Sequence, residues 1–116
     1  MEPLKDKPPN LFEHLLVPAT GERFENLLEH ESLVIERIVS SAAPEPTSYD
    51  QAHDEWVLLV QGEAELEVLG ERVSLRPGDY LFLPAHTAHK VLKTSAGAVW
   101  LAVHLRSGKS SLPGSH

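Results

Sequence analysis

The chain has 116 residues and a formal net charge of −7, from 17 acidic and 10 basic side chains. This length suits one domain with a single core, and 41% hydrophobic and 23% charged residues are ordinary for a globular protein. The negative charge offers no broad cationic surface for phosphate backbones, and the lack of cysteine excludes disulfides, thiolate metal sites and a cysteine nucleophile.

The N-terminal segment predicts neither a secretion signal nor a membrane anchor. Residues 1–10 are polar and proline-rich, and no apolar run in the chain approaches the ~18 residues of a membrane span. We therefore expect a cytoplasmic protein that binds neither membranes nor nucleic acid. We expect residues 1–32 to form an N-terminal arm with a short helix, residues 33–106 the main domain, and residues 107–116 a flexible tail.

The helix is predicted between Thr20 and Glu31. Phe24, Leu27 and Leu28 recur there at helical spacing, and acidic residues come early in the segment. This pattern is typical of a short amphipathic helix, which we expect to lie outside the main domain.

From Leu33 onward the pattern changes to that of short β-strands. Apolar and polar residues alternate, β-branched residues are frequent, and turns are expected at Gly62 and at Pro77-Gly78. Many short strands at near-regular spacing predict a closed all-β fold such as a jelly roll. The expected strands cover residues 33–39, 56–61, 64–68, 72–75, 80–83, 89–94 and 98–105.

Two residues with ionisable side chains, His104 and Arg37, lie within these strands. If Val99, Leu101 and Val103 face the core, His104 has the opposite parity, and we expect it to be structural or exposed. Arg37 is expected to form a surface ion pair with one of the many glutamates rather than to line a pocket.

Polar residues cluster before the strand that starts at Trp56. The segment Tyr49-Asp50-Gln51-Ala52-His53-Asp54-Glu55 gathers side chains that bind metals or donate and accept hydrogen bonds. The spacing of Glu55 and Gly62 resembles the first motif of the cupin family. Tyr49 and Gln51 stand where that family has its two histidines.

A second cluster, Gly78 to His89, resembles the second cupin motif. Gly78, Pro84 and His89 occupy the family's positions, whereas His86 replaces the usual glycine and Lys93 the usual asparagine. The resemblance covers roughly residues 33–105.

The resemblance implies a small cupin: a double-stranded β-helix, or jelly-roll barrel, that commonly dimerises. It also implies a pocket for a small polar molecule and a divalent metal, with iron, manganese, nickel or zinc as candidates. Tyr49 and His86 are the candidates for proton transfer. The candidate metal ligands are Gln51, Glu55, His89 and His53.

Three functions remain open at this point. The first is a metal-dependent enzyme, with dioxygenase and isomerase as the chemistries that the resemblance implies. The second is a non-catalytic module that binds a small ligand without a functional metal. The third is a structural dimer with a filled pocket. In the second case Gln51 and Glu55 belong to a buried hydrogen-bond network, since buried polar groups need partners.

Overall fold

The computed structural model describes residues 7–45 and 47–106, so the tail predicted at residues 107–116 lies outside the described residues. The described residues form strands and no helix. In chain order the strands are β1 (Glu22–His30), β2 (Leu33–Ser40), β3 (Ser48–Tyr49), β4 (Asp54–Gln61), β5 (Ala64–Val68), β6 (Glu71–Leu75), β7 (Tyr80–Leu83), β8 (His89–Thr94) and β9 (Ala98–Leu105).

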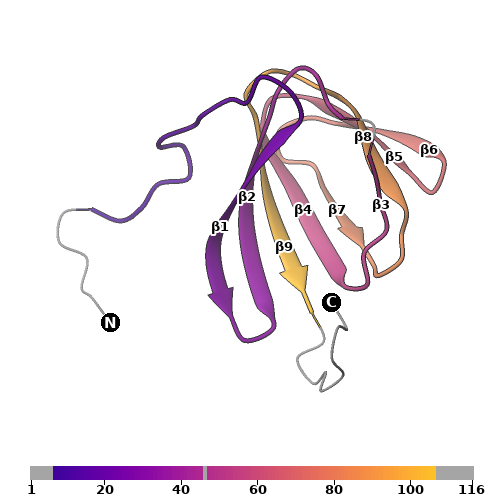
Figure 1. Ribbon diagram of the computed structural model, residues 1–116, viewed down its shortest axis with the longest axis horizontal. Coiled ribbons are helices and arrows are strands. Elements are labelled where there is room, and N and C mark those ends of the chain that lie inside the picture. The colour runs from indigo at the N-terminus through magenta and orange to yellow at the C-terminus, as the bar shows by residue number, and fades with distance from the viewer. Residues whose placement is uncertain (1–6, 46, 107–116) are drawn as a thin grey trace.

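The strands form two antiparallel sheets that face each other across the interior (Figure 1). One sheet has the order β1-β2-β9-β4-β7 and the other the order β3-β8-β5-β6. Strands distant in sequence are therefore neighbours, as β2 and β4 are on either side of β9. This arrangement confirms the predicted all-β jelly-roll fold.

The core lies between the sheets and follows the alternation of side chains along each strand. On β4, Val57 and Leu59 face inward and are buried, and on β9 the large side chain of Trp100 is flanked by Ala98 and Ala102. The two alanines leave room for the indole ring, so large and small side chains interdigitate.

The predicted turn at Gly62 joins β4 to β5 at a place where only glycine fits. Its φ is 88°, and a Cβ atom there would lie 2.7 Å from Ser95 Oγ and 2.8 Å from Ala98 Cα. Glycine thus supplies both the left-handed backbone and the close approach of the hairpin to β9.

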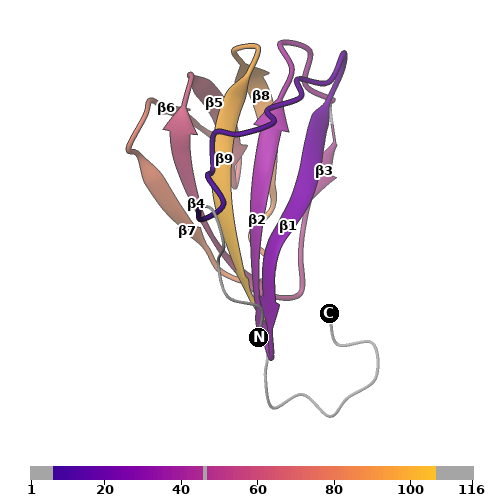
Figure 2. The ribbon, with the colours of Figure 1, turned by 90° about the vertical axis from the view of Figure 1, so that its left-hand side faces the viewer.

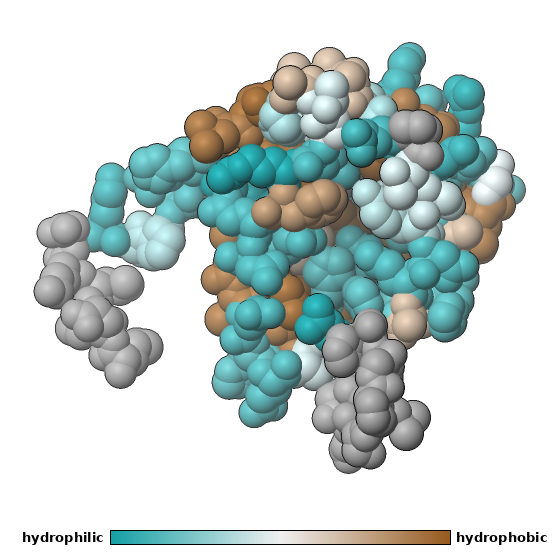
Figure 3. Space-filling view, in the orientation of Figure 1, coloured by the Kyte–Doolittle hydropathy of each residue, from teal (hydrophilic) through white to brown (hydrophobic). Residues whose placement is uncertain are grey.

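The predicted N-terminal helix is wrong, because Glu22–His30 forms strand β1, paired antiparallel with β2. The register shifts between Asn26 and Leu28, so Leu27 is an extra residue in the strand. Such a bulge interrupts the two-residue alternation and gives Phe24, Leu27 and Leu28 a spacing that imitates a helix. All three side chains are about half exposed, and Figure 3 shows hydrophobic side chains gathered on the β1–β2 side of the molecule.

The segment before β1 crosses the outer face of the larger sheet, in front of β9 and β2 (Figure 2). Arg37 of β2 holds it there: its guanidinium donates hydrogen bonds to the carbonyl oxygens of Leu11, Glu13 and His14 and to the carboxylate of Glu25. Arg37 is only 4% exposed. It does form an ion pair with a glutamate, but its planar fork of donors also anchors the arm to its own sheet.

No helix long and apolar enough to span a bilayer occurs in the described part of the chain.

Candidate functional site

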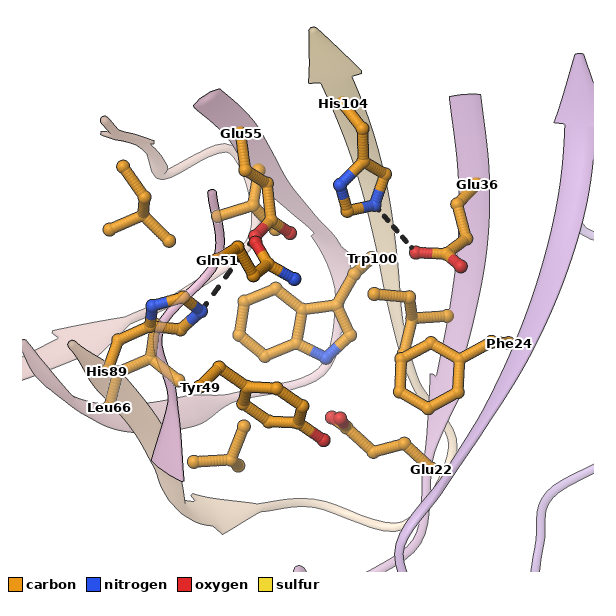
Figure 4. A pocket seen from close by; sticks show the side chains of 14 residues that line it. Glu22, Phe24, Glu36, Tyr49, Gln51, Glu55, Leu66, His89, Trp100 and His104 are labelled. Atoms are coloured by element: carbon orange, nitrogen blue, oxygen red, sulfur yellow. Dashed lines mark hydrogen bonds and ion pairs between the residues drawn. The ribbon is translucent and has the colours of Figure 1, made fainter. Parts of the chain in front are cut away.

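A cavity of about 70 Å³ lies between the two sheets (Figure 4). This volume holds a few waters or a ligand of few non-hydrogen atoms, since one water needs roughly 10–15 Å³ on the same measure. The residues that line the cavity come from both sheets. They are Glu22, Phe24, Glu36, Ile38, Tyr49, Gln51, Glu55, Val57, Leu66, Leu83, His89, Val91, Trp100 and His104.

Glu55 and His89 face each other in the cavity from opposite sheets. Glu55 Oε1 lies 3.8 Å from His89 Nε2, and both side chains are about nine-tenths buried. His89 Nδ1 donates to the carbonyl oxygen of Thr87 at 2.8 Å, so in the neutral ring Nε2 carries a lone pair. Glu55 Oε1 has no hydrogen-bond partner among the described residues. Two acceptors therefore face one space without a donor between them.

Tyr49 and Gln51 complete this side of the cavity. Tyr49 is the antiparallel partner of His89 on β8, and the two rings are stacked with centroids 5.7 Å apart. Gln51 lies just after β3 and lines the same cavity, with its side chain shown in front of Glu55 and His89 in Figure 4. Four of the six predicted site residues thus come together at the pocket: Tyr49, Gln51, Glu55 and His89.

The other two predicted residues lie elsewhere. His86 has a left-handed backbone with φ of 63°, which explains why the cupin motif has glycine at this position. Its imidazole is largely exposed and lies 3.1 Å from the carboxylate of Asp50. Neither His86 nor His53 is among the described residues that line the cavity.

His53 instead begins a chain of hydrogen bonds that leads to the cavity wall. His53 Nε2 lies 2.9 Å from His104 Nδ1, and His104 Nε2 lies 2.9 Å from Glu36 Oε1. The hydrogen bond with Glu36 raises the pKa of His104, whereas burial and the charge of His104 lower the pKa of His53. This favours a charged His104 that donates to both a carboxylate and a neutral imidazole.

On the far side of Trp100, Glu22 is held by a second chain of hydrogen bonds. The Trp100 indole Nε1–H donates to Ser40 Oγ at 3.0 Å, and the Ser40 hydroxyl donates to Glu22 Oε2 at 2.8 Å. Burial raises the pKa of Glu22, and the hydrogen bond from Ser40 opposes that effect. The serine therefore fixes one carboxylate oxygen against the wall of the cavity.

Burial also sets the protonation of the other acids. It raises the pKa of Glu55, with the charges of His104 and His89 acting against it, and raises the pKa of Tyr49, assisted by nearby glutamates. A carboxyl with a raised pKa holds its proton closer to neutral pH, where it is able to act as an acid as well as a base.

Sequence reasoning missed the side of the pocket formed by Glu36 and His104. The expectation that His104 faces away from the core was wrong, because Ala98, Trp100 and Ala102 face inward and His104 lies on the same face of β9. Both faces of β9 are apolar, so alternation alone could not identify the inner one. The small residues on either side of Trp100 were the available signal, because a large ring in a narrow interior needs small neighbours.

The donor set fits a metal only in part. Among the described residues, no group of three histidine, aspartate or glutamate side chains lies close enough together to hold an ion. His89 Nε2 and Glu55 Oε1 are two free ligand atoms in one cavity, and a third protein ligand there would be the amide oxygen of Gln51.

Two facing sheets around a pocket with a few convergent polar groups are the architecture of a small β-barrel. The family model for the cupin domain matches residues 35–104. The chain therefore belongs to the cupin family, which confirms the resemblance of its two motifs.

Solved structures of other proteins share this fold. A protein named "putative mannose-6-phosphate isomerase" from Ralstonia eutropha JMP134 is 44% identical, with a TM-score of 0.77, and the match covers 87% of this chain and 99% of that one. KdgF from a Halomonas species is 25% identical over 75% of this chain and 81% of that one, with a TM-score of 0.67.

An RmlC-like cupin from Shewanella frigidimarina NCIMB 400 has a TM-score of 0.69 at 21% identity, over 81% of this chain and 86% of that one. At this identity the likeness shows the fold alone. No curated protein matches the chain.

The buried carboxyl of Glu55 predicts a specific dependence of stability on pH. Because the pKa of Glu55 is raised above its ordinary value of 4.5, the folded protein keeps a proton that the unfolded chain has released. The free energy of unfolding therefore falls as pH rises from 4.5 through the raised pKa. We expect the free energy of unfolding of Glu55→Gln to fall less over this pH range than that of the wild type. Urea denaturation at several pH values measures both.

Glu71→Gln is the matched control, since Glu71 is exposed on β6. Its pH profile should follow that of the wild type. A Glu55→Gln profile that also follows the wild type would contradict a pKa of Glu55 raised by burial.

Proposed function

We propose that this cupin binds a small polar molecule in the cavity between its sheets and recognises it through Glu55 and His89. One observation carries the proposal: Glu55 Oε1 is buried without a partner among the described residues, 3.8 Å from His89 Nε2. A buried polar group without a partner costs about 1–3 kcal/mol. A ligand that donates a hydrogen bond to both atoms would remove that cost.

The enzymatic form of this proposal is an isomerase that works by proton transfer. Glu55, with a pKa raised by burial, and the imidazole of His89 are the acid–base groups nearest to each other in the cavity. Proton transfer by positioned side chains typically contributes about 10²–10⁴-fold to a rate. Tyr49, stacked on His89, would orient the imidazole and present its hydroxyl to the ligand. The name of the 44% identical relative includes an isomerase activity, which supports this direction.

Binding in the cavity is testable with the two tryptophans as reporters. Trp100 lines the cavity, whereas Trp56 lies on the adjacent strand β4 and does not line it. We expect at least one compound from a panel of small sugars, polyols, amines and carboxylic acids to shift the NMR signal of the Trp100 indole N–H and not that of Trp56. Val91→Phe, which adds a ring to the cavity wall, should abolish the shift.

Leu69→Phe is the control, because it adds the same ring at an exposed turn. A compound whose effect persists in Val91→Phe binds elsewhere. If every active compound behaves in that way, the cavity is not the binding site.

A second candidate is a metal-dependent enzyme, and the lone pair of His89 Nε2 favours it. The Nδ1–H of His89 donates to a backbone carbonyl, as in most metal-binding histidines, so Nε2 is oriented as a ligand beside the free oxygen of Glu55. A bound divalent ion would polarise a carbonyl for isomerase chemistry or activate oxygen for dioxygenase chemistry. His89, Glu55 and Gln51 would hold it, and Tyr49 would bind the organic molecule beside it. One imidazole, one carboxylate and one amide should hold an ion more weakly than three imidazoles.

Calorimetric titration of the untagged protein with Fe(II), Mn(II), Ni(II) and Zn(II) tests this second candidate. We expect His89→Gln and Glu55→Gln each to weaken binding by at least the roughly 10–100-fold that loss of an outer-shell partner costs. His86→Gln should retain the ion, since the imidazole of His86 is outside the cavity. Equal loss in all three variants, or none in any, would contradict the assignment of the ligands.

We also propose that the protein forms a homodimer through the outer face of β9, β4 and β7. Two apolar rows cross these three strands in register: Val103, Trp56 and Phe82 form one row, and Leu101, Leu58 and Tyr80 the other. Tyr80 is 64% and Phe82 56% exposed. A contiguous exposed patch with aromatic side chains is typical of a protein–protein interface.

We expect the wild type to behave as a dimer in light scattering coupled to gel filtration and Phe82→Glu to behave as a monomer. Leu27→Glu places the same charge at a half-exposed leucine on β1 and should leave the dimer intact. A wild type that is monomeric at every concentration would refute this interface.

A further inference from the structure

The charge of the cavity wall restricts what the cavity is able to bind. Three carboxylates line it, from Glu22, Glu36 and Glu55, and none of the described lining residues is a lysine or arginine. Glu36 is paired with His104, whose charge balances it. Glu22 and Glu55 have no hydrogen-bonded counter-ion among the described lining residues. Glu22 accepts only the neutral hydroxyl of Ser40, and Glu55 Oε1 accepts nothing among the described residues.

The one other basic group on the wall does not supply a counter-charge in its present geometry. His89 donates through Nδ1 to a carbonyl, and its Nε2 lies 3.8 Å from Glu55 Oε1, beyond hydrogen-bond distance. The gap between these two atoms is therefore suited to a donor that bonds to both. An ammonium group has several N–H donors and a positive charge, and thus fits a lone pair facing a carboxylate.

The rest of the wall is aromatic. The rings of Phe24, Tyr49 and Trp100 line the same cavity, and Figure 4 shows the indole between the Glu55–His89 side and the Glu22–Phe24 side. The faces of aromatic rings attract cations within about 6 Å, most strongly when the cation is desolvated. Carboxylates and aromatic rings together compensate a small organic cation for the hydration free energy that it loses on leaving water.

Burial acts in the same direction. Glu55 is buried and Glu22 is partly buried, and an ionised carboxylate out of water is costly without a nearby positive charge. A cation in the cavity would offset that cost. A phosphate ester would have the opposite effect, since it would bring about two negative charges next to carboxylates without an arginine or lysine on the wall to receive it.

From this geometry we propose that the cavity selects small organic cations bearing an ammonium group and rejects phosphorylated molecules. The ammonium group bonds to Glu55 Oε1 and His89 Nε2, with the ring of Trp100 and the carboxylate of Glu22 farther along the same cavity wall. The inference rests on the proposed function, because it names the class of ligand for the same cavity. It also separates this protein from what the name of its 44% identical relative would suggest, a phosphorylated sugar.

Matched probes test the role of charge at constant shape. Propylammonium and 1-propanol have the same number of non-hydrogen atoms and differ mainly in charge, as do ethylammonium and ethanol at a smaller size. Mannose and mannose 6-phosphate test a neutral and an anionic polyol. Calorimetric titration and the NMR signal of the Trp100 indole N–H give affinity and location. We expect at least one ammonium compound to bind about 10- to 100-fold more tightly than its neutral partner, the range for a hydrogen bond to a charged group. Mannose 6-phosphate should not bind.

Variants identify the carboxylates that matter. Glu55→Gln and Glu22→Gln keep the shape of the side chain and remove its charge, and each should reduce affinity for the ammonium compound by a similar factor. Neither should weaken binding of a neutral compound to the same degree. Glu71→Gln, an exposed carboxylate of β6, should change nothing.

The outcomes separate this inference from the proposed function. If mannose or an alcohol shifts the Trp100 signal as strongly as the cations do, and Glu55→Gln binds both equally, the cation proposal is overturned while the cavity stands as a binding site. Tight binding of mannose 6-phosphate overturns it as well. If no probe or panel compound shifts Trp100, the proposed function fails together with it.

Discussion

The pocket depends on one constraint, the fixed inward direction of Glu55 on β4. Val57 and Leu59 on the same face of that strand are core residues, and Trp56 and Leu58 point to the other face. A slip of one residue would expose the core side chains and bury the outer ones, so the strand has a single acceptable register. Glu55 therefore remains inside, opposite His104 on β9, although burial of its carboxylate is unfavourable.

The cost of burying a carboxylate is met differently at the three glutamates of the cavity. Glu36 has a charged partner in His104, which is itself bonded to His53, so this carboxylate is already paired within the protein. Glu22 accepts a hydrogen bond from a neutral hydroxyl, and Glu55 Oε1 lies 3.8 Å from His89 Nε2, beyond hydrogen-bond distance. The polar groups of the cavity thus form two sets. In the closed set, Glu36 and His104 bond to each other, whereas in the open set, Glu22 and Glu55 are still able to accept a hydrogen bond from a ligand. Buried polar groups that lack partners in a native structure are good indicators of function for this reason.

Much of this arrangement could be predicted from the sequence, and the exceptions have physical causes. Strand positions after Leu33 followed from alternation and from turns at glycine and proline, and the motif spacing identified Tyr49, Gln51, Glu55 and His89 as neighbours at one pocket. These features are local or depend on spacing within one segment.

What could not be predicted depends on contacts between distant segments. The bulge in β1 made a strand resemble a helix, and only its pairing with β2 reveals it. The two apolar faces of β9 could not be told apart until its neighbours were known, which concealed His104. His53 was expected in the pocket because its residue type suits a metal, but it bonds to His104 instead. Side-chain partners from segments distant in the sequence are not encoded in spacing along the chain.

A direct measurement of the pKa of Glu55 tests the central claim, by NMR titration of the ¹³C-labelled carboxyl groups with Glu55→Gln to assign the signal. The account predicts a pKa above the ordinary value of 4.5, because the carboxyl is buried and its oxygen lacks a partner in the cavity wall. A pKa at or below 4.5 would mean that Glu55 is solvated or paired with a positive charge in the protein itself. It would then not be the open group on which recognition of a ligand depends.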